Sequence, residues 1–241
     1  MDIIHLSETT STNLWLQEHQ SQTADSGMTV CWADYQTAGR GCGSNRWESE
    51  RGKNLLFSVR FRPEGIAAER QFTISMATPL AIIDELDDMG ISDISIKWPN
   101  DIYWKDRKLA GMRIDNKLRG HDISDCIIGI GLNVNQEKFV SDAPNPVSLC
   151  HILGREVARK PLLERLLSRI ETALKPDASL PLRYNNRLYR RVGFHAYRDQ
   201  DGDFEAETAG VEPDGTLVLR DRKGTLRRYA FKEVSFVISN Q

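Results

Sequence analysis

The chain has 241 residues, of which 40% are hydrophobic and 27% are charged. This length supports one sizeable hydrophobic core and leaves room for a small appended domain. The net charge of −2 and the pI near 6.2 argue against a general nucleic-acid-binding protein, which is usually clearly basic.

The N-terminal third of the chain predicts short strands, two helices and one glycine-rich loop. The N-terminus of the chain does not resemble a signal peptide, and the whole sequence contains no apolar run near the roughly 20 residues that span a bilayer. We therefore expect a cytoplasmic protein without membrane contact. Serine and threonine over 7–12 can cap a first helix. Residues 69–89 predict a second helix, which Pro79 should kink or break. Strands are expected over 3–6, 29–35 and 54–61.

The middle of the chain predicts four short strands, which are rich in β-branched or aromatic residues and separated by polar turns. This spacing favours an antiparallel or mixed sheet over βαβ units. Two helices should follow, the first with leucines on one face and arginines on the other. The strands are expected over 94–98, 102–104, 109–114 and 126–134, and the helices over 161–174 and 182–191.

The pattern changes after about Arg191, where short strands alternate with glycine-containing turns. Strands are expected over 204–208, 216–219 and 226–231. Closely spaced hairpins of this kind predict a small β-barrel. We therefore predict a domain over residues 1–190 and a second domain over residues 191–241.

Three segments carry candidate chemistry, and the first is the loop Gly39–Trp47, GRGCGSNRW. Backbone amides and an arginine guanidinium can together face a phosphate or a carboxylate. An ordinary surface loop is the alternative. The loop lacks the GK[ST] ending of a P-loop and the GxGxxG pattern of dinucleotide-binding folds.

The second segment is Lys97–Asp101 (KWPND), which is followed by Lys108–Gly111 (KLAG). One lysine enters a tight turn and another leaves it, so two cations and a carboxylate can surround one point. A plain β-hairpin with Asp106 and Arg107 at its tip explains the spacing equally well.

The third segment is Gly129–Asn135, GIGLNVN. Glycines that alternate along an apolar strand leave one face without side chains, so a flat ligand can lie against the backbone. Close packing of a helix on the same face is the alternative.

Together these segments resemble the biotin protein ligases, in the order and approximate spacing of that family. The resemblance covers nearly the whole chain and includes a C-terminal part, from Gly215 to Phe236, that looks like the family's SH3-like barrel. The matching motifs are Ser11-Thr12-Asn13, Tyr35–Gly41, Lys97–Asp101, Lys108–Gly111 and Gly129–Asn133.

The resemblance implies an α+β fold, with a mixed sheet flanked by helices like that of class II aminoacyl-tRNA synthetases, plus the small barrel. It also implies a two-step ligase reaction. The carboxylate of biotin attacks the α-phosphate of ATP, giving biotinyl-5′-AMP and pyrophosphate. A lysine of a biotin carboxyl carrier protein, or of a carboxylase's carrier domain, then attacks the mixed anhydride and releases AMP. ATP with Mg²⁺ is the expected co-substrate and activator, biotin is the substrate, and no tightly bound prosthetic group is expected.

The resemblance also assigns residues to biotin. Ser11, Thr12 and Gln36 correspond to residues that bond the ureido ring, and these side chains offer donors and acceptors for it. Asn13 either joins this set or caps the first helix. The remaining residues assigned to biotin are Gly39, Arg40, Gly41, Cys42, Lys108, Gly129 and Gly131.

Two cations are the expected catalytic residues. Arg40, with the amides of its loop, matches the family's contacts to carboxylate and phosphate. In the family this loop is mobile and closes over the ligand, which shields the anhydride from water. Lys108 matches the lysine beside the reacting oxygens, where its charge stabilises the transition state. The reaction needs no covalent enzyme intermediate, so Cys42 is not expected to be a nucleophile.

The nucleotide is expected near Asn100, Asp101 and Asn133. Trp47 either packs over the closed loop beside the nucleotide or anchors the loop structurally. The sequence does not indicate which residues would bind the metal.

The sequence departs from the family pattern at two places. Many members have a second arginine where this chain has Cys42, so retention of the adenylate is in question. Some members begin with a DNA-binding helix-turn-helix domain, whereas here the first motif begins at Ser11. We therefore expect no specific DNA binding.

Three other functions are alternatives to biotin ligation. They are lipoate or octanoate attachment on the same fold, a ligand-sensing repressor, and a non-catalytic biotin-binding module. The presence of Arg40 and Lys108 argues against the last. Family members include homodimers, so a monomer and a homodimer are both compatible with the sequence, which also does not indicate the acceptor carboxylase or the task of the barrel.

Overall fold

The computed structural model describes residues 1–19, 27–41, 46–140 and 145–238. The chain divides into two compact units, each made of two segments. The first unit contains Met1–Gln71 and Arg107–Leu167, and the second contains Phe72–Asp106 and Ser168–Gln241. Among the helices of the described part of the chain, none is both long enough and apolar enough to cross a membrane.

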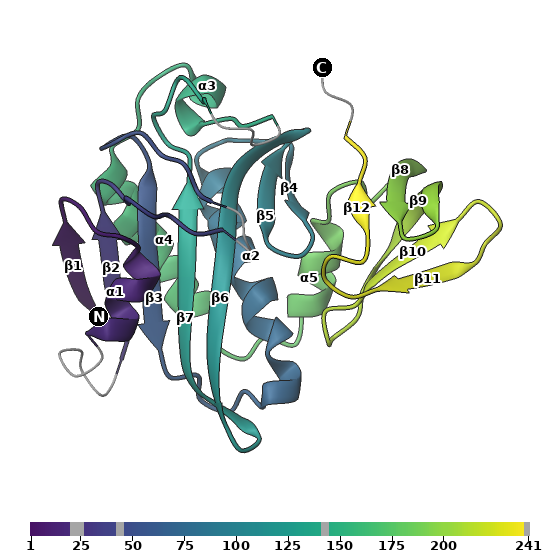
Figure 1. The fold of residues 1–241 in the computed structure, drawn as a ribbon, viewed down its shortest axis with the longest axis horizontal. Coiled ribbons are helices and arrows are strands. Elements are labelled where there is room, and N and C mark those ends of the chain that lie inside the picture. The colour runs from purple at the N-terminus through teal and green to yellow at the C-terminus, as the bar shows by residue number, and fades with distance from the viewer. Residues whose placement is uncertain (20–26, 42–45, 141–144, 239–241) are drawn as a thin grey trace. The chain divides into compact units, whose positions relative to one another are not determined.

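The first unit is built on strands in the order β1-β2-β3-β7-β6 (Figure 1). Strand β1 is parallel to β2, and the other neighbours are antiparallel, so the predicted mixed sheet is confirmed. Figure 1 shows helix α1 in front of the sheet and helix α4 behind it. The elements are β1 (Asp2–Leu6), α1 (Thr12–Glu18), β2 (Thr29–Ala33), β3 (Leu55–Phe61), the 3-10 helix Ala68–Arg70, β6 (Arg107–Arg119), β7 (Asp122–Leu132), α3 (Leu149–Leu153) and α4 (Arg159–Ala173), which begins in this unit.

One face of this sheet is an apolar core. Side chains of directly paired residues share a face, and Phe57 pairs with Ile130, which pairs in turn with Met112. All three are buried. Leu162 and Leu166, from the first turns of α4, are also fully buried.

The opposite face is covered in part by α1, whose Leu16 packs with Cys31 and Ile127. Beyond this small cluster the face becomes polar or bare. Ser58 of β3 pairs with Gly129 of β7, which pairs in turn with Arg113 of β6. We call this the site face of the sheet.

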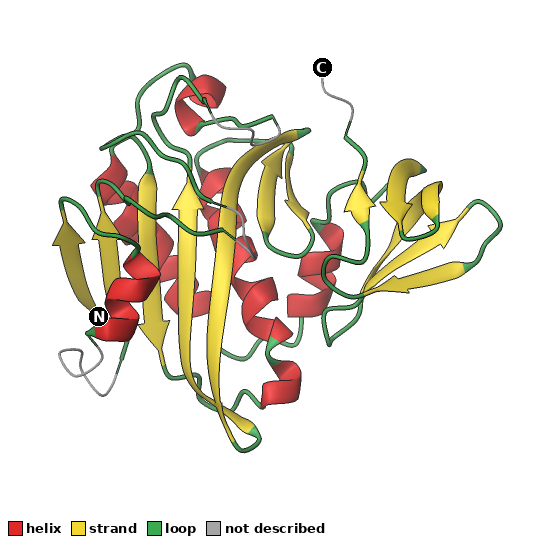
Figure 2. Cartoon of the chain, viewed as in Figure 1, coloured by secondary structure: helices red, strands yellow, loops and turns green. Residues whose placement is uncertain are grey.

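The second unit contains two helices that pack against each other, a β-hairpin from its first segment and a C-terminal sheet (Figure 2). Helix α2 packs against α5, and β4 pairs with β5. The elements are α2 (Phe72–Asp88), β4 (Ile94–Lys97), β5 (Asp101–Trp104), α5 (Leu180–Asn186), β8 (His195–Asp199), β9 (Gly202–Val211), β10 (Leu217–Asp221), β11 (Leu226–Tyr229) and β12 (Ser235–Phe236).

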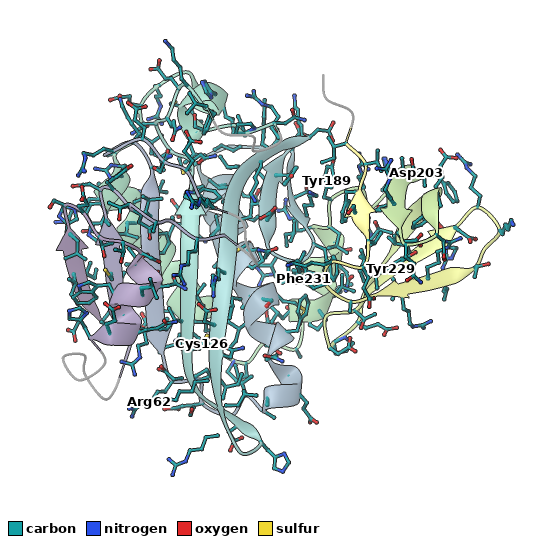
Figure 3. All side chains as sticks on the ribbon, viewed as in Figure 1. Arg62, Cys126, Tyr189, Asp203, Tyr229 and Phe231 are labelled. Atoms are coloured by element: carbon teal, nitrogen blue, oxygen red, sulfur yellow. The ribbon has the colours of Figure 1, made fainter. Side chains whose placement is uncertain are left out.

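The C-terminal strands form an antiparallel sheet in the order β11-β10-β9-β8-β12. Within the described residues no pairing joins β11 to β12, so the small β-barrel that the sequence predicted is an open antiparallel sheet. The physical reason is the last strand, which has only two residues and pairs with β8 alone. Tyr229 of β11, labelled in Figure 3, donates its hydroxyl hydrogen to Asp199 Oδ2 at 2.7 Å.

Helix α2 runs through Pro79 without a break, and the kink expected as the other possibility stays a prediction. A proline removes one backbone hydrogen bond and costs about 3 kcal/mol in a helix interior. Most of α2 is buried, including Ile74, Leu80 and Ile83, and this packing outweighs that loss.

Several contacts join residues before Arg191 to the C-terminal sheet. Trp98 Nε1 donates to the carbonyl of Gly215 at 2.9 Å. Asn185 accepts from the Val211 amide at 2.7 Å and donates to the Val211 carbonyl at 3.3 Å. The domain boundary near Arg191 stays a prediction, and any such boundary is bridged by these bonds.

Candidate functional site

The two N-terminal motifs lie side by side in the first unit. Thr9 forms a parallel bridge with Gln36, which continues the pairing of β1 with β2 beyond the strand ends. The Thr9 amide donates to the Tyr35 carbonyl at 3.1 Å, and the Thr37 amide donates to the Thr9 carbonyl at 2.9 Å. Segments that are more than twenty residues apart in the sequence are thereby held together.

The Gln36 side chain is oriented by the backbone of α1. The Thr12 amide donates to Gln36 Oε1 at 2.8 Å, so the Gln36 –NH2 group faces away from Thr12. Ser11 stands at the N-cap position but makes no side-chain cap bond. The Ser11 hydroxyl therefore does not cap the helix, although Ser11 as a residue is buried.

A chain of hydrogen bonds runs from Thr12 across the site face. The Thr12 hydroxyl lies 2.6 Å from Ser58 Oγ, and Ser58 Oγ donates to Asn13 Oδ1. Asn13 Nδ2 donates to Asp115 Oδ2 at 3.0 Å. Arg113 Nε donates to both carboxylate oxygens of Asp115 at 3.0 Å. Asn13 is thus committed to this chain, and it does not cap α1.

Sequence analysis missed Ser58, Arg113 and Asp115. They come from β3 and β6, whereas the recognised glycines come from β7, which lies between those strands. The available signal was weak: Ser58 is a lone hydroxyl in an apolar strand, and Arg113 and Asp115 alternate with Met112 and Ile114.

The glycines of β7 make room for two side chains of the protein itself. A Cβ atom at Gly129 would lie 2.1 Å from Asn13 Oδ1, and one at Gly131 would lie 2.3 Å from Trp47 Cε2. No other residue fits at either position unless Asn13 or Trp47 moves. Contact of these glycines with a bound ligand stays a prediction.

The glycine-rich loop is closed at its base. The Trp47 amide donates to the Gly39 carbonyl at 3.0 Å, and Arg40 pairs with Arg46. A Cβ atom at Gly39 would lie 2.5 Å from the Trp47 carbonyl oxygen, so this crossing requires glycine. Arg40 is exposed and the Gly41 carbonyl accepts from Arg113 Nη1 at 3.5 Å, whereas Cys42 lies outside the described residues.

Trp47 and Lys108 lie together. The Lys108 ammonium is 5.7 Å from the centre of the Trp47 ring, a cation–π distance. The indole Nε1 of Trp47 is buried without a hydrogen-bond partner among the described residues. An unpaired buried donor is costly, and a ligand oxygen would remove that cost.

The predicted nucleotide residues are divided between the two units. Asn133 is buried in the first unit, where its Nδ2 donates to the Val147 carbonyl at 3.0 Å. Asn100 and Asp101 belong to the second unit, in and after the turn that follows β4. A nucleotide-binding role for these three residues stays a prediction.

Asp34 and Arg159 support the segment that carries Gln36. Arg159 Nη2 donates to Asp34 Oδ1 at 2.8 Å, and His5 Nε2 lies 3.2 Å from Asp34 Oδ2. Burial opposes ionisation of Asp34, but the bonds from Arg159 and His5 hold its pKa below the usual value. The ionised carboxylate is therefore a fixed anchor two residues before Gln36.

The buried thiols of the sheet are not reactive groups. Burial raises the pKa of Cys31 to about 12. Burial also raises the pKa of Cys126, labelled on β7 in Figure 3, with smaller contributions from Asp125 and Asp115. Thiolates are the nucleophilic form, so these residues remain neutral and inert. In the described part of the chain, no group of three or more His, Cys, Asp or Glu residues could hold a metal ion.

Comparisons with known proteins agree with this arrangement. The sequence model of the biotin/lipoate A/B protein ligase family matches residues 5–133. The chain is 26% identical over 230 residues to the bifunctional ligase/repressor BirA of Bacillus subtilis, which spans 91% of this chain and 70% of that protein. It is 30% identical over 217 residues to BirA of Escherichia coli, which spans 86% of this chain and 65% of that protein.

The fold leads to the same group of proteins. A solved structure of biotin protein ligase from Aquifex aeolicus, in complex with biotin and ATP, matches with a TM-score of 0.80 and 25% identity, covering 99% of each chain. The match to the family's sequence model alone covers more than half of the chain. The protein therefore belongs to the biotin/lipoate A/B protein ligase family and is a ligase.

Proposed function

We propose that this ligase activates biotin as biotinyl-5′-AMP at the expense of ATP and transfers the biotinyl group to a lysine of a biotin carboxyl carrier protein or domain. The similar biotin protein ligase of Aquifex aeolicus, whose structure contains biotin and ATP, supports biotin and ATP as the substrates. The E. coli and B. subtilis relatives are bifunctional ligase/repressors, which supports ligation as the reaction.

The observation that carries the proposal is the orientation of Gln36. Its oxygen accepts the Thr12 amide, so its –NH2 group faces away from Thr12 and can donate to a ligand. A ureido ring offers one carbonyl acceptor and two N–H donors. Gln36 would donate to the carbonyl, while the hydroxyl oxygens of Ser11 and Thr12 would accept from the two N–H groups.

The second half of the substrate would meet positive charge. Arg40 and the amides of its loop would contact the biotin carboxylate and the α-phosphate. Lys108, whose ammonium already lies over Trp47, would offset repulsion between those two anions and stabilise the transition state. Mg²⁺ would accompany ATP, and Asn100, Asp101 and Asn133 would lie near the nucleotide.

Measurement of pyrophosphate release tests which carboxylic acid the enzyme activates. With MgATP, biotin should drive release, whereas lipoate and octanoate should be poorer by at least about 10³, because a site built for polar groups strongly rejects a ligand that lacks them. Gln36→Glu keeps the size of the side chain but removes both N–H donors. It should raise the KM for biotin by at least about tenfold and leave the KM for ATP unchanged.

Transfer is tested separately with a biotin carrier domain and with its acceptor lysine changed to arginine. Mass increase of the first and not of the second is expected. Comparable turnover with lipoate would assign the protein to the lipoate branch of its family, and pyrophosphate release without any acceptor labelling would contradict the transfer step.

A further inference from the structure

The hydrogen-bond chain on the site face has a direction that its last member imposes. Arg113 donates to both carboxylate oxygens of Asp115. As a carboxylate, Asp115 has no hydrogen to donate and can only accept hydrogen bonds. It therefore requires the –NH2 group of Asn13, and the Asn13 oxygen must turn towards Ser58.

The remaining hydrogens follow from that orientation. Ser58 has one hydroxyl hydrogen, which it donates to Asn13 Oδ1. The separation of 2.6 Å between Ser58 and the Thr12 hydroxyl also requires a hydrogen, and it can come only from Thr12. The Thr12 hydroxyl hydrogen is therefore directed to Ser58 and not to Gln36 Oε1, which lies further away at 3.1 Å. The order of donation is Thr12 to Ser58 to Asn13 to Asp115.

This direction decides what Thr12 offers to a ligand. A hydroxyl that donates to Ser58 keeps both oxygen lone pairs, so it presents an acceptor. If the chain ran the other way, Ser58 would donate to Thr12 and occupy one of those lone pairs. Thr12 would then donate towards Gln36 Oε1. A ligand N–H group is best accepted in the first case.

We propose that Asp115 is a positioning residue for biotin recognition: through Asn13 and Ser58, it fixes the Thr12 hydroxyl as an acceptor for a ureido N–H group. The inference rests on the proposed function and extends it to a residue that does not touch the substrate. Arg113 assists by fixing the carboxylate through two hydrogen bonds, and its bond to the Gly41 carbonyl ties the same ion pair to the base of the glycine-rich loop.

The first variant is Asp115→Asn, which preserves shape but supplies its own –NH2 group. That group can donate to Asn13 Oδ1, which turns the Asn13 amide around and reverses the chain. The KM for biotin should rise by about tenfold, the effect of one weakened neutral hydrogen bond. The kcat and the KM for ATP should stay within about twofold of the wild type, since Thr12 acts on binding alone.

The second variant restores the direction with exchanged groups. In Asn13→Asp/Asp115→Asn, the new carboxylate at position 13 accepts from Ser58 and from the new amide at position 115. The KM for biotin should return to within about threefold of the wild type. Asn13→Asp alone places two carboxylates against each other. It should bind biotin more weakly than either Asp115→Asn or the double variant.

A matched control exists on the same sheet. Arg60 Nε donates to both oxygens of Asp125, at 2.9 and 3.1 Å, in the geometry of the Arg113–Asp115 pair. In the described contacts, Asp125 receives no side-chain amide from α1. Asp125→Asn should therefore leave the KM for biotin unchanged, whatever it does to the free energy of unfolding.

Each outcome decides a different claim. A wild-type protein that releases no pyrophosphate with biotin contradicts the proposed function itself. A wild-type enzyme that does so, together with a normal biotin KM in Asp115→Asn or an unrescued double variant, overturns only the positioning role. If Asp115→Asn folds poorly, Asn13→Asp with Asp115 intact takes its place, because two adjoining carboxylates cannot keep the chain, and it should raise the biotin KM by at least about tenfold. A normal KM there overturns the inference as well.

Discussion

The two faces of the first unit's sheet use the same strands for different purposes. On one face, Phe57, Ile130 and Met112 form part of the core. On the other, the adjacent residues Ser58, Gly129 and Arg113 form the polar site face. Successive side chains of a strand point to opposite faces. Each pairing that builds the core therefore also aligns the site.

The comparison explains why the site needs no separate scaffold. A register slip of one residue would exchange the two faces, and the burial of the apolar face opposes it strongly. Substitutions on the two faces should accordingly differ in kind. Core substitutions should lower the free energy of unfolding, and site-face substitutions should change binding or catalysis.

The largest effect is expected from Phe57→Ala, on the apolar face. Phe57 is fully buried, so the substitution removes a large apolar side chain and leaves a cavity. The free energy of unfolding should fall by about 3–5 kcal/mol, measured by urea denaturation. The KM for biotin of the folded protein should not change, and a raised KM would show that the two faces are not separable. Leu118→Ala, at an exposed leucine of β6, is the control and should change stability by less than about 0.5 kcal/mol.

Lys108→Ala should have the next largest effect, this time on rate. If the Lys108 charge acts on the transition state, single-turnover adenylation should slow by roughly 10²–10³. The KM for biotin should rise much less. Lys117→Ala removes a lysine from the exposed end of the same strand and should leave the rate unchanged. Near-normal adenylation in Lys108→Ala would exclude the proposed role of its charge.

Gly131→Ala tests the contact between the site face and Trp47. The new methyl group would lie 2.3 Å from Trp47 Cε2, so the indole must move. The free energy of unfolding should fall by about 1–3 kcal/mol, the usual effect of overpacking. In a Trp47→Ala background the same methyl group should cost little, and denaturation of all four proteins measures this coupling. An equal loss in both backgrounds would mean that Trp47 is not what the glycine accommodates.

The smallest effect is expected from Cys42→Arg. A charge-assisted hydrogen bond to the adenylate contributes on the order of 1.5–3 kcal/mol, whereas a thiol is only a weak neutral donor. The variant should release biotinyl-AMP about ten times more slowly, at the lower end of that range. Stopped-flow release of pre-formed adenylate measures the difference, and equal rates would indicate that position 42 does not reach the intermediate.

The fold could be predicted to the extent that residues alternate or repeat regularly. Strand β3 was expected almost to its ends because apolar residues run through Leu55–Phe61. Strand β6 was expected only over 109–114, but it spans Arg107–Arg119, because the polar residues of its solvent-exposed end mimic a turn. The two-residue β12 and the short helix α3 were missed because they are too short to show a period. Strand β8, HAYRD, was missed because most of its residues are polar or charged and hide the alternation.

The candidate site was predicted unevenly for a related reason. Motif spacing identified Thr12 and Gln36, which the structure brings to hydrogen-bond distance. It could not identify Ser58 or Asp115, because their positions depend on the register of three strands that are distant in the sequence. Cross-strand register follows from packing of the whole sheet and has no local signal.

The interleaving of the two units along the chain has a consequence for synthesis. Most of helix α2 is buried, and α5, which packs against it, begins about 90 residues further along the chain. A ribosome adds roughly 5–20 residues per second. For several seconds, therefore, the nascent chain presents an apolar helix before its partner exists. The first unit can close only after its second segment has emerged, beyond this same helix. A holdase that covers α2 during this interval should raise the yield of folded protein more than one that acts on the completed chain.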